Sequence, residues 1–112
     1  MARLDQVLAK LAEIEAEMKR IGYWDGSLDA AAVRQQAIDY AREHDESPIG
    51  QMPFEHWLQC VFIPNARAAA RTDSLPSSSR VAVMAMRQYD YHSHVPEAQE
   101  LLRLLGEFDD LF

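Results

Sequence analysis

A proline-bracketed apolar stretch at residues 52–64 constrains this chain more than any other part of its sequence. Pro53 suits the first turn of a helix, because its missing N–H would have no partner there. Large apolar residues then recur at the spacing of one helix face; they are Phe54, Trp57, Leu58, Val61 and Phe62. Pro64 falls where the helix should continue, and it leaves the carbonyl of Cys60 without its usual donor. Helix-forming residues follow Pro64, so we expect a kinked central helix over residues 53–71.

Two other segments carry strong apolar stripes that need a partner. The first stripe alternates three and four residues apart and consists of Leu4, Val7, Leu11, Ile14, Met18 and Ile21. The second contains Ala98, Leu101, Leu104, Leu105, Phe108 and Leu111 or Phe112, after Pro96 opens that helix. A coiled-coil dimer would use the first stripe in the same way. Because Leu8 broadens that stripe, we favour one helix of an intramolecular bundle, ended by Gly22.

Two further segments have weaker patterns. Residues 28–43 are rich in helix formers but have one shallow apolar face, so we expect an additional irregular helix or loop there. Residues 81–86 are apolar almost all round, which indicates a well-buried helix or a buried strand-like run; we take a helix over about residues 79–88. The predicted fold is all-α: an antiparallel four-helix bundle in a single domain over residues 1–112, with a kinked central helix.

Charge and composition exclude several classes of function. The net charge is −7, and no segment is basic enough to bind nucleic acid directly. A basic protein partner suits this charge better. No apolar run is long enough to span a membrane, the N-terminus lacks a signal-peptide core, and the single cysteine, Cys60, suits a reducing compartment. We therefore expect a cytoplasmic protein without membrane contact, as a monomer or weak homodimer.

Six residues are the candidates for binding a partner: Tyr23, Trp24, Trp57, Gln59, Tyr89 and Tyr91. Four of them are aromatic residues outside the stripes, which either pack down over a bundle end or form an exposed patch, since Tyr and Trp are enriched at interfaces. On the central helix, Trp57 and Gln59 have two interpretations. Either Trp57 anchors the core while Gln59 lies on a solvated flank, or both line a shallow groove.

The alternative is a small-ligand binder or enzyme that uses a cleft near His56, Gln59 and Cys60. His56 and Cys60 lie four residues apart and so share one helix side. A buried structural thiol is the commoner role for such a cysteine. His92 and His94 are too close and too few for a zinc site, which needs three or four ligands. No catalytic motif is present, so we predict no cofactor and no metal, and favour a non-enzymatic module.

The stretch from Phe54 to Pro64, with its Trp57-Leu58-Gln59 core and terminal proline, resembles the signature of the small bacterial YqcC family. The first helix, ending near Gly22-Tyr23-Trp24, and the last helix are also similar, whereas residues 25–50 depart from that family, whose members are less helical there. The resemblance implies a small helical bundle of unknown activity. Genes of that family often lie beside one for a tRNA pseudouridine synthase, which implies an accessory role to a tRNA-modifying enzyme.

Overall fold

The computed structural model describes residues 2–44, 52–89 and 95–112, and these residues form helices joined by loops. The helices are α1 (Ala2–Arg20), α2 (Ala30–His44), a continuous central helix, α5 (Val81–Tyr89) and α6 (Gln99–Asp109), which a short 3₁₀ turn, η3 (Pro96–Ala98), precedes. The central helix consists of α3 (Phe54–Trp57), η2 (Leu58–Phe62) and α4 (Ile63–Arg71). No strand occurs among the described residues, so the predicted all-α fold is confirmed.

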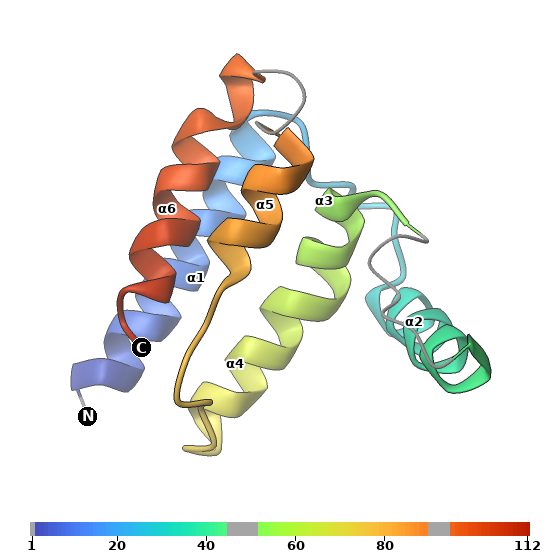
Figure 1. Cartoon of the computed structure of the whole chain (residues 1–112), viewed down its shortest axis with the longest axis horizontal. Helices are drawn as coiled ribbons and strands as arrows, with labels where there is room; N and C mark the ends of the chain where they lie inside the picture. The colour runs from blue at the N-terminus through green and yellow to red at the C-terminus, as the bar shows by residue number, and fades with distance from the viewer. Residues whose placement is uncertain (1, 45–51, 90–94) are drawn as a thin grey trace.

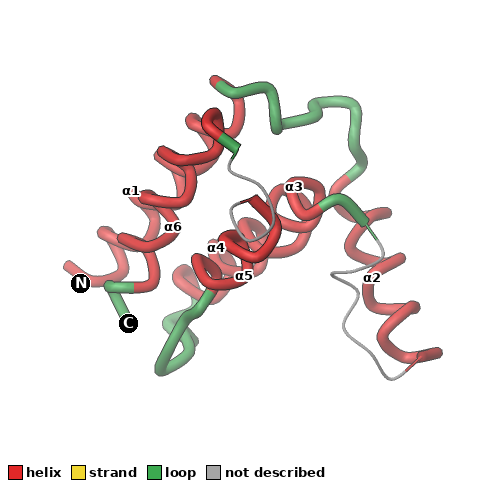
Figure 2. Tube along the Cα trace, turned by 45° about the horizontal axis from the view of Figure 1, so that its top comes forward, coloured by secondary structure: helices red, strands yellow, loops and turns green. Residues whose placement is uncertain are grey.

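Four of these helices form an up-and-down bundle, and α2 stands to one side of it (Figure 1). In chain order α1, the central helix, α5 and α6 alternate in direction, so α1 and α6 lie side by side and antiparallel, as a second view also shows (Figure 2). The bundle buries one core, to which each of its helices contributes. The predicted four-helix bundle is therefore confirmed, with the 28–43 segment as a helix outside it.

The two predicted stripes form the main wall of this core. Val7, Leu11, Ile14 and Met18 are fully buried on α1, and Leu101 and Leu105 are fully buried on α6. Burying each such side chain contributes about 1.5–3 kcal/mol. The stripe on α1 ends at Gly22, whose φ of +81° is the left-handed conformation that glycine adopts at a helix C-terminus.

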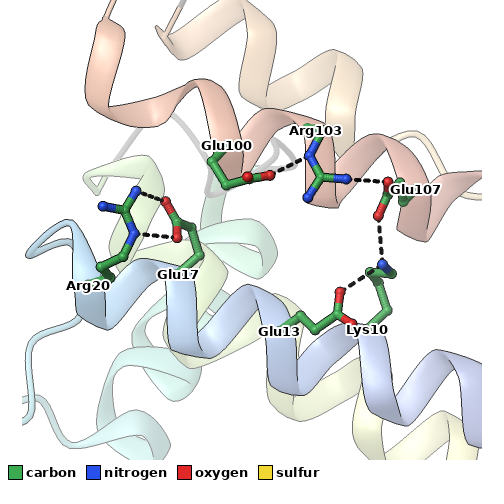
Figure 3. A network of polar contacts seen from close by, with 7 residues as sticks. All are labelled: Lys10, Glu13, Glu17, Arg20, Glu100, Arg103 and Glu107. Atoms are coloured by element: carbon green, nitrogen blue, oxygen red, sulfur yellow. Dashed lines mark hydrogen bonds and ion pairs between the residues drawn. The ribbon is translucent and has the colours of Figure 1, made fainter.

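Paired charges flank the seam between α1 and α6 (Figure 3). Lys10 donates to Glu13 on its own helix and to Glu107 on α6, at 2.7 Å each. Arg103 on α6 bonds both Glu100 and Glu107. The hydrogen bonds to Glu107 and Glu13 raise the pKa of Lys10 above its usual value. Ion pairs near the surface contribute little energy each, and of these only Lys10–Glu107 joins the two helices.

The central helix continues through Pro64, as expected, and accommodates it by widening. Residues 58–62 form a π-helical stretch in which the N–H of Ile63 donates to the carbonyl of Leu58, five residues back. Proline lacks an N–H and its ring clashes with the carbonyl four residues before it. A wider turn just before Pro64 places the carbonyls differently and lets the helix continue.

An acidic side chain from α6 caps the start of α5. The Asp109 carboxylate accepts hydrogen bonds from the N–H groups of Val81 (3.1 Å) and Ala82 (2.9 Å) and from the hydroxyl of Ser79 (2.5 Å). The first N–H groups of a helix have no partner within it, so this carboxylate satisfies two of them. The contact ties the end of α6 to the beginning of α5.

Candidate interaction cleft

An apolar cleft of about 310 Å³ opens between the central helix, the loop after it and the C-terminal residues. Its walls are almost entirely apolar and aromatic; they are Trp57, Val61, Phe62, Asn65, Ala66, Ala69, Leu75, Pro76, Phe108 and Phe112. Such a volume is at the lower end of the range for ligand pockets, which are mainly apolar with a few polar groups. It is also large enough to receive one apolar anchor side chain of a protein partner.

A series of aromatic contacts fixes the walls of this cleft. Trp57 stacks on Phe62 with ring centroids 5.9 Å apart, and Phe62 meets Phe108 edge to face at 5.2 Å. Phe108 in turn contacts Phe112 at 5.0 Å, and the guanidinium of Arg3 lies 5.0 Å from the Phe112 ring centroid. Each aromatic pair contributes roughly 0.5–1.5 kcal/mol beyond its buried area. The cleft is therefore built on packed side chains of the central helix and α6, and Arg3 of α1 helps to hold Phe112 at its edge.

The π-helical stretch explains why Trp57 and Phe62 lie together. In a regular α-helix, residues five apart point in directions that differ by about 140°. In a π-helix one turn is closed by an i to i+5 bond, so residues five apart share a face. The widened turn before Pro64 thus brings the two rings onto the same wall of the cleft.

Gln59 has neither of the two roles that the sequence suggested. Its side chain is 6% exposed, so it does not lie on a solvated flank, and it does not line this cleft. The amide instead holds the loop after α1, because its Oε1 accepts from the N–H of Asp25 at 2.9 Å and its Nε2 donates to the carbonyl of Asp25 at 2.7 Å. Both hydrogen bonds are satisfied only by this loop conformation. Gln59 therefore fixes the start of the connection to α2.

Three of the predicted loop aromatics pack against the bundle. Tyr23 and Trp24 are partly buried against the core, and Lys19 lies over the Trp24 ring at 5.2 Å. Tyr89 is 7% exposed, contacts Tyr23 at 5.5 Å and donates its hydroxyl to Glu55 at 3.0 Å. Burial and the Glu55 carboxylate raise the pKa of Tyr89 far above its usual value. The interpretation of an exposed aromatic patch is therefore wrong for Tyr89, and Tyr91 lies outside the described residues.

The chain also matches a known protein family over most of its length. A family model described as "DUF446: tRNA pseudouridine synthase C" matches residues 6–111. The chain belongs to the DUF446 family. This is an uncharacterised domain family, as the sequence resemblance implied, although the match does not confirm the name YqcC. No curated protein and no solved structure matches the chain.

In this DUF446 chain, the residues of the alternative site do not share one cleft. Cys60 is fully buried, and burial, aided by the charges of Asp25 and Asp29, raises the pKa of its thiol. A raised thiol pKa is the reverse of what a nucleophilic cysteine needs. His56 lines a second cavity of about 330 Å³, which Gln59 and Cys60 do not line. The predicted grouping of these three residues is therefore wrong, although a cavity does lie beside His56.

That second cavity lies between α2 and the beginning of the central helix. Besides His56 it is lined by Leu28, Val33, Gln36, Ala37, Tyr40 and Met52.

Among the residues that the structure describes, no three His, Cys, Asp or Glu side chains gather in a way that could hold a metal ion. In the same parts of the chain, no helix is long and apolar enough to cross a membrane.

The apolar segment at the start of α5 is not buried all round, as its composition suggested. Val81 and Ala85 face the core, whereas Val83 is 47% and Met86 is 49% exposed. The expectation of a well-buried helix is wrong, because α5 lies at the surface of the bundle with one face against α6. Its outer face adds a second exposed apolar surface to the DUF446 fold.

Proposed function

We propose that this DUF446 domain is a non-enzymatic interaction module that binds a protein partner through the cleft beside Trp57. The observation that carries the proposal is the cleft itself, an apolar hollow of about 310 Å³ walled by aromatic side chains of the central helix, α6 and the C-terminal residue. Binding energy at protein interfaces is concentrated in a few apolar or aromatic anchors that fill such hollows. A partner inserts one large apolar side chain between Trp57 and Phe112.

The charge of the domain supports a basic partner. The chain carries a net charge of −7, and complementary charge around an apolar anchor speeds association and orients the partner. We expect the partner to present Lys or Arg residues around its anchor side chain. Raising the salt concentration then slows association more than it speeds dissociation.

The description of the family names a tRNA pseudouridine synthase, and we propose such an enzyme as the partner. Direct binding of tRNA requires several Lys or Arg side chains that neutralise phosphates. A domain with 18 acidic and 11 basic residues is poorly suited to that task. An accessory role, in which the enzyme holds the tRNA and this domain binds the enzyme, fits the charge better.

A pair of variants on one helix tests the role of the cleft. Ala69→Phe places a ring in the cleft that Ala69 lines, whereas Ala68→Phe adds the same ring at an exposed position one residue earlier. Affinity purification with mass spectrometry, run at two salt concentrations, should recover a specific partner with the wild type and with Ala68→Phe. Loss of that partner with Ala69→Phe alone supports the proposal. Equal recovery with both variants would show that the cleft is not the binding surface.

A reconstituted assay tests the link to tRNA modification. Pseudouridine formation in tRNA is measured with the purified domain alone, with a pseudouridine synthase alone, and with both together. We expect no product from the domain alone and an altered rate or affinity when both are present. Product from the isolated domain would refute the non-enzymatic assignment, and identical rates with and without the domain would refute this choice of partner.

A second candidate function is binding of a small molecule in the cavity beside His56. The observation in its favour is a volume of about 330 Å³ that combines apolar walls with the polar side chains of Gln36 and His56. Thermal-shift screening against metabolites tests it with Val33→Phe, which fills the cavity. A ligand that stabilises the wild type but not Val33→Phe would support this function, and a screen without such a ligand would count against it.

A further inference from the structure

Helix α2 contributes nothing to the core of the bundle. The sixteen buried residues of the core cluster, and the partly buried residues that pack on them, come from the other helices and their loops. Of the fifteen residues of α2, one, Ala37, is buried. Ile38 on the same helix is 44% exposed. Figure 1 shows α2 standing to one side of the four helices of the bundle, where it rests on the central helix.

The π-helical stretch of the central helix is the surface on which α2 rests. Two buried apolar residues lie outside the core cluster: Ala37 on α2 and Cys60 on this stretch. The carboxylates of Asp25 and Asp29, in the loop that leads into α2, lie close enough to Cys60 to affect its thiol. Because Cys60 is buried outside the core cluster, on the stretch that α2 contacts, we infer that α2 and this loop cover it.

Among the residues that the structure describes, side-chain hydrogen bonds hold the loop before α2 and the first turn of α2. Gln59 holds the loop at Asp25, and Asp29 caps the first turn of α2 by accepting from the N–H groups of Ala31 and Ala32. A helix of fifteen residues is only marginally stable in water when it stands alone. Once α2 leaves the central helix, it therefore unfolds. Segments with few buried apolar contacts are those that open without global unfolding.

We propose that α2 opens as an independent cover, exposing Cys60 and the outer face of the π-helical stretch while the four-helix bundle stays folded. Opening breaks the contact between α2 and the central helix and leaves the packing of α1 against α6 in place. The single cysteine of the chain makes the motion measurable, since no other thiol reacts with an alkylating reagent and Cys60 is buried until the chain opens.

The experiment measures the rate at which Cys60 is alkylated by iodoacetamide at pH 8, in a series of urea concentrations below the unfolding transition. In the closed state Cys60 is fully buried, so alkylation requires opening. We expect a measurable rate in water that depends only weakly on urea, because opening of α2 exposes much less surface than global unfolding. A rate with the full urea dependence of global unfolding would overturn the proposal.

Two glycine variants separate local from global opening. Gln35→Gly weakens α2 at an exposed position and also removes the hydrogen bond from Gln35 to Asp39 within that helix. Ala12→Gly makes a comparable change at an exposed position of α1, which is one of the four helices of the bundle. We expect Gln35→Gly to accelerate alkylation in water about fivefold and Ala12→Gly to leave it unchanged. Equal acceleration by both, or none by Gln35→Gly, would show that α2 does not open on its own.

Discussion

Replacement of Asp109 by alanine should weaken the junction between α5 and α6. The Asp109 carboxylate accepts from two N–H groups in the first turn of α5 and from the hydroxyl of Ser79. Loss of a side-chain cap costs about 0.5–2 kcal/mol. The carboxylate also lies at the C-terminus of α6, where its charge is unfavourable by about 0.3–1 kcal/mol. The same charge is favourable by a similar amount at the N-terminus of α5, so the two helix-dipole contributions nearly cancel.

We therefore expect Asp109→Ala to lower the free energy of unfolding by about 1.5 kcal/mol. Asp109→Asn keeps one acceptor oxygen and should lose about half as much, roughly 0.8 kcal/mol. The measurement is urea denaturation followed by circular dichroism, with the free energies obtained by linear extrapolation. Both variants should keep the helical content of the wild type in the absence of urea.

Asp110 provides the matched control. It follows Asp109 directly, is exposed, and its side chain makes no hydrogen bond or ion pair with any residue that the structure describes. Asp110→Ala removes the same charge from the end of α6 without touching α5, and should change the stability by less than about 0.5 kcal/mol. If Asp109→Ala and Asp110→Ala differ by less than that, the Asp109 carboxylate does not stabilise α5 through these hydrogen bonds.

Three further predictions follow from single contacts. Gln59→Glu replaces the donor to the Asp25 carbonyl with a charge and should destabilise the chain by about 2 kcal/mol in urea denaturation; an unchanged midpoint would contradict this. Gly106→Ala should stabilise α6 by about 0.5–1 kcal/mol, because alanine has the higher helix propensity and the added methyl group meets no described atom within 4 Å beyond the adjoining residues and backbone of its own helix. A lowered melting temperature would contradict this. The hydrogen bonds from Arg20 lower the pKa of Glu17, so this pair stabilises the fold above the ordinary glutamate pKa and the contribution disappears as the pH falls through the lowered value. The urea midpoint of Glu17→Gln should accordingly fall less than that of the wild type between pH 5 and pH 3, and parallel curves would refute the assignment.

The bundle itself could be predicted because its signals are local and periodic. The residues of the α1 stripe recur every three or four positions, and the four in its middle are fully buried. The same holds for α6, where Leu101 and Leu105 are fully buried. Periodicity failed on α5, where nearly every residue from Val81 to Met86 is apolar. Such a run has no polar face to mark the solvent side, so the sequence gives no reason to expect an exposed Val83.

The polar contacts that hold the loop before α2 and the start of α5 could not be predicted from the sequence, since each joins residues distant along the chain. Gln59 and Asp25 are 34 residues apart, and Asp109 caps a helix that begins 28 residues earlier. Only the folded bundle brings these groups together, and nothing in the local pattern distinguishes Gln59 from a surface glutamine. The cleft was predicted only in part, as a shallow groove that Trp57 lines, and its other walls escaped prediction for a related reason. Its aromatic walls depend on the π-helical turn, and Pro64 indicates a disturbance there without specifying its form.

The two proposals concern different sides of the same five-residue stretch. Trp57 directly precedes residues 58–62 and Phe62 is the last of them, and the two rings form a wall of the apolar cleft. Gln59, inside that stretch, bonds the loop before α2, and the stretch itself is the surface on which α2 rests. A widened turn with α-helix on both sides costs stability unless neighbouring contacts compensate for it, and such turns often occur at functional sites. Here the aromatic contacts compensate on one side and the Gln59 hydrogen bonds on the other. A partner in the cleft and a displaced α2 would therefore each act on the geometry of the same turn.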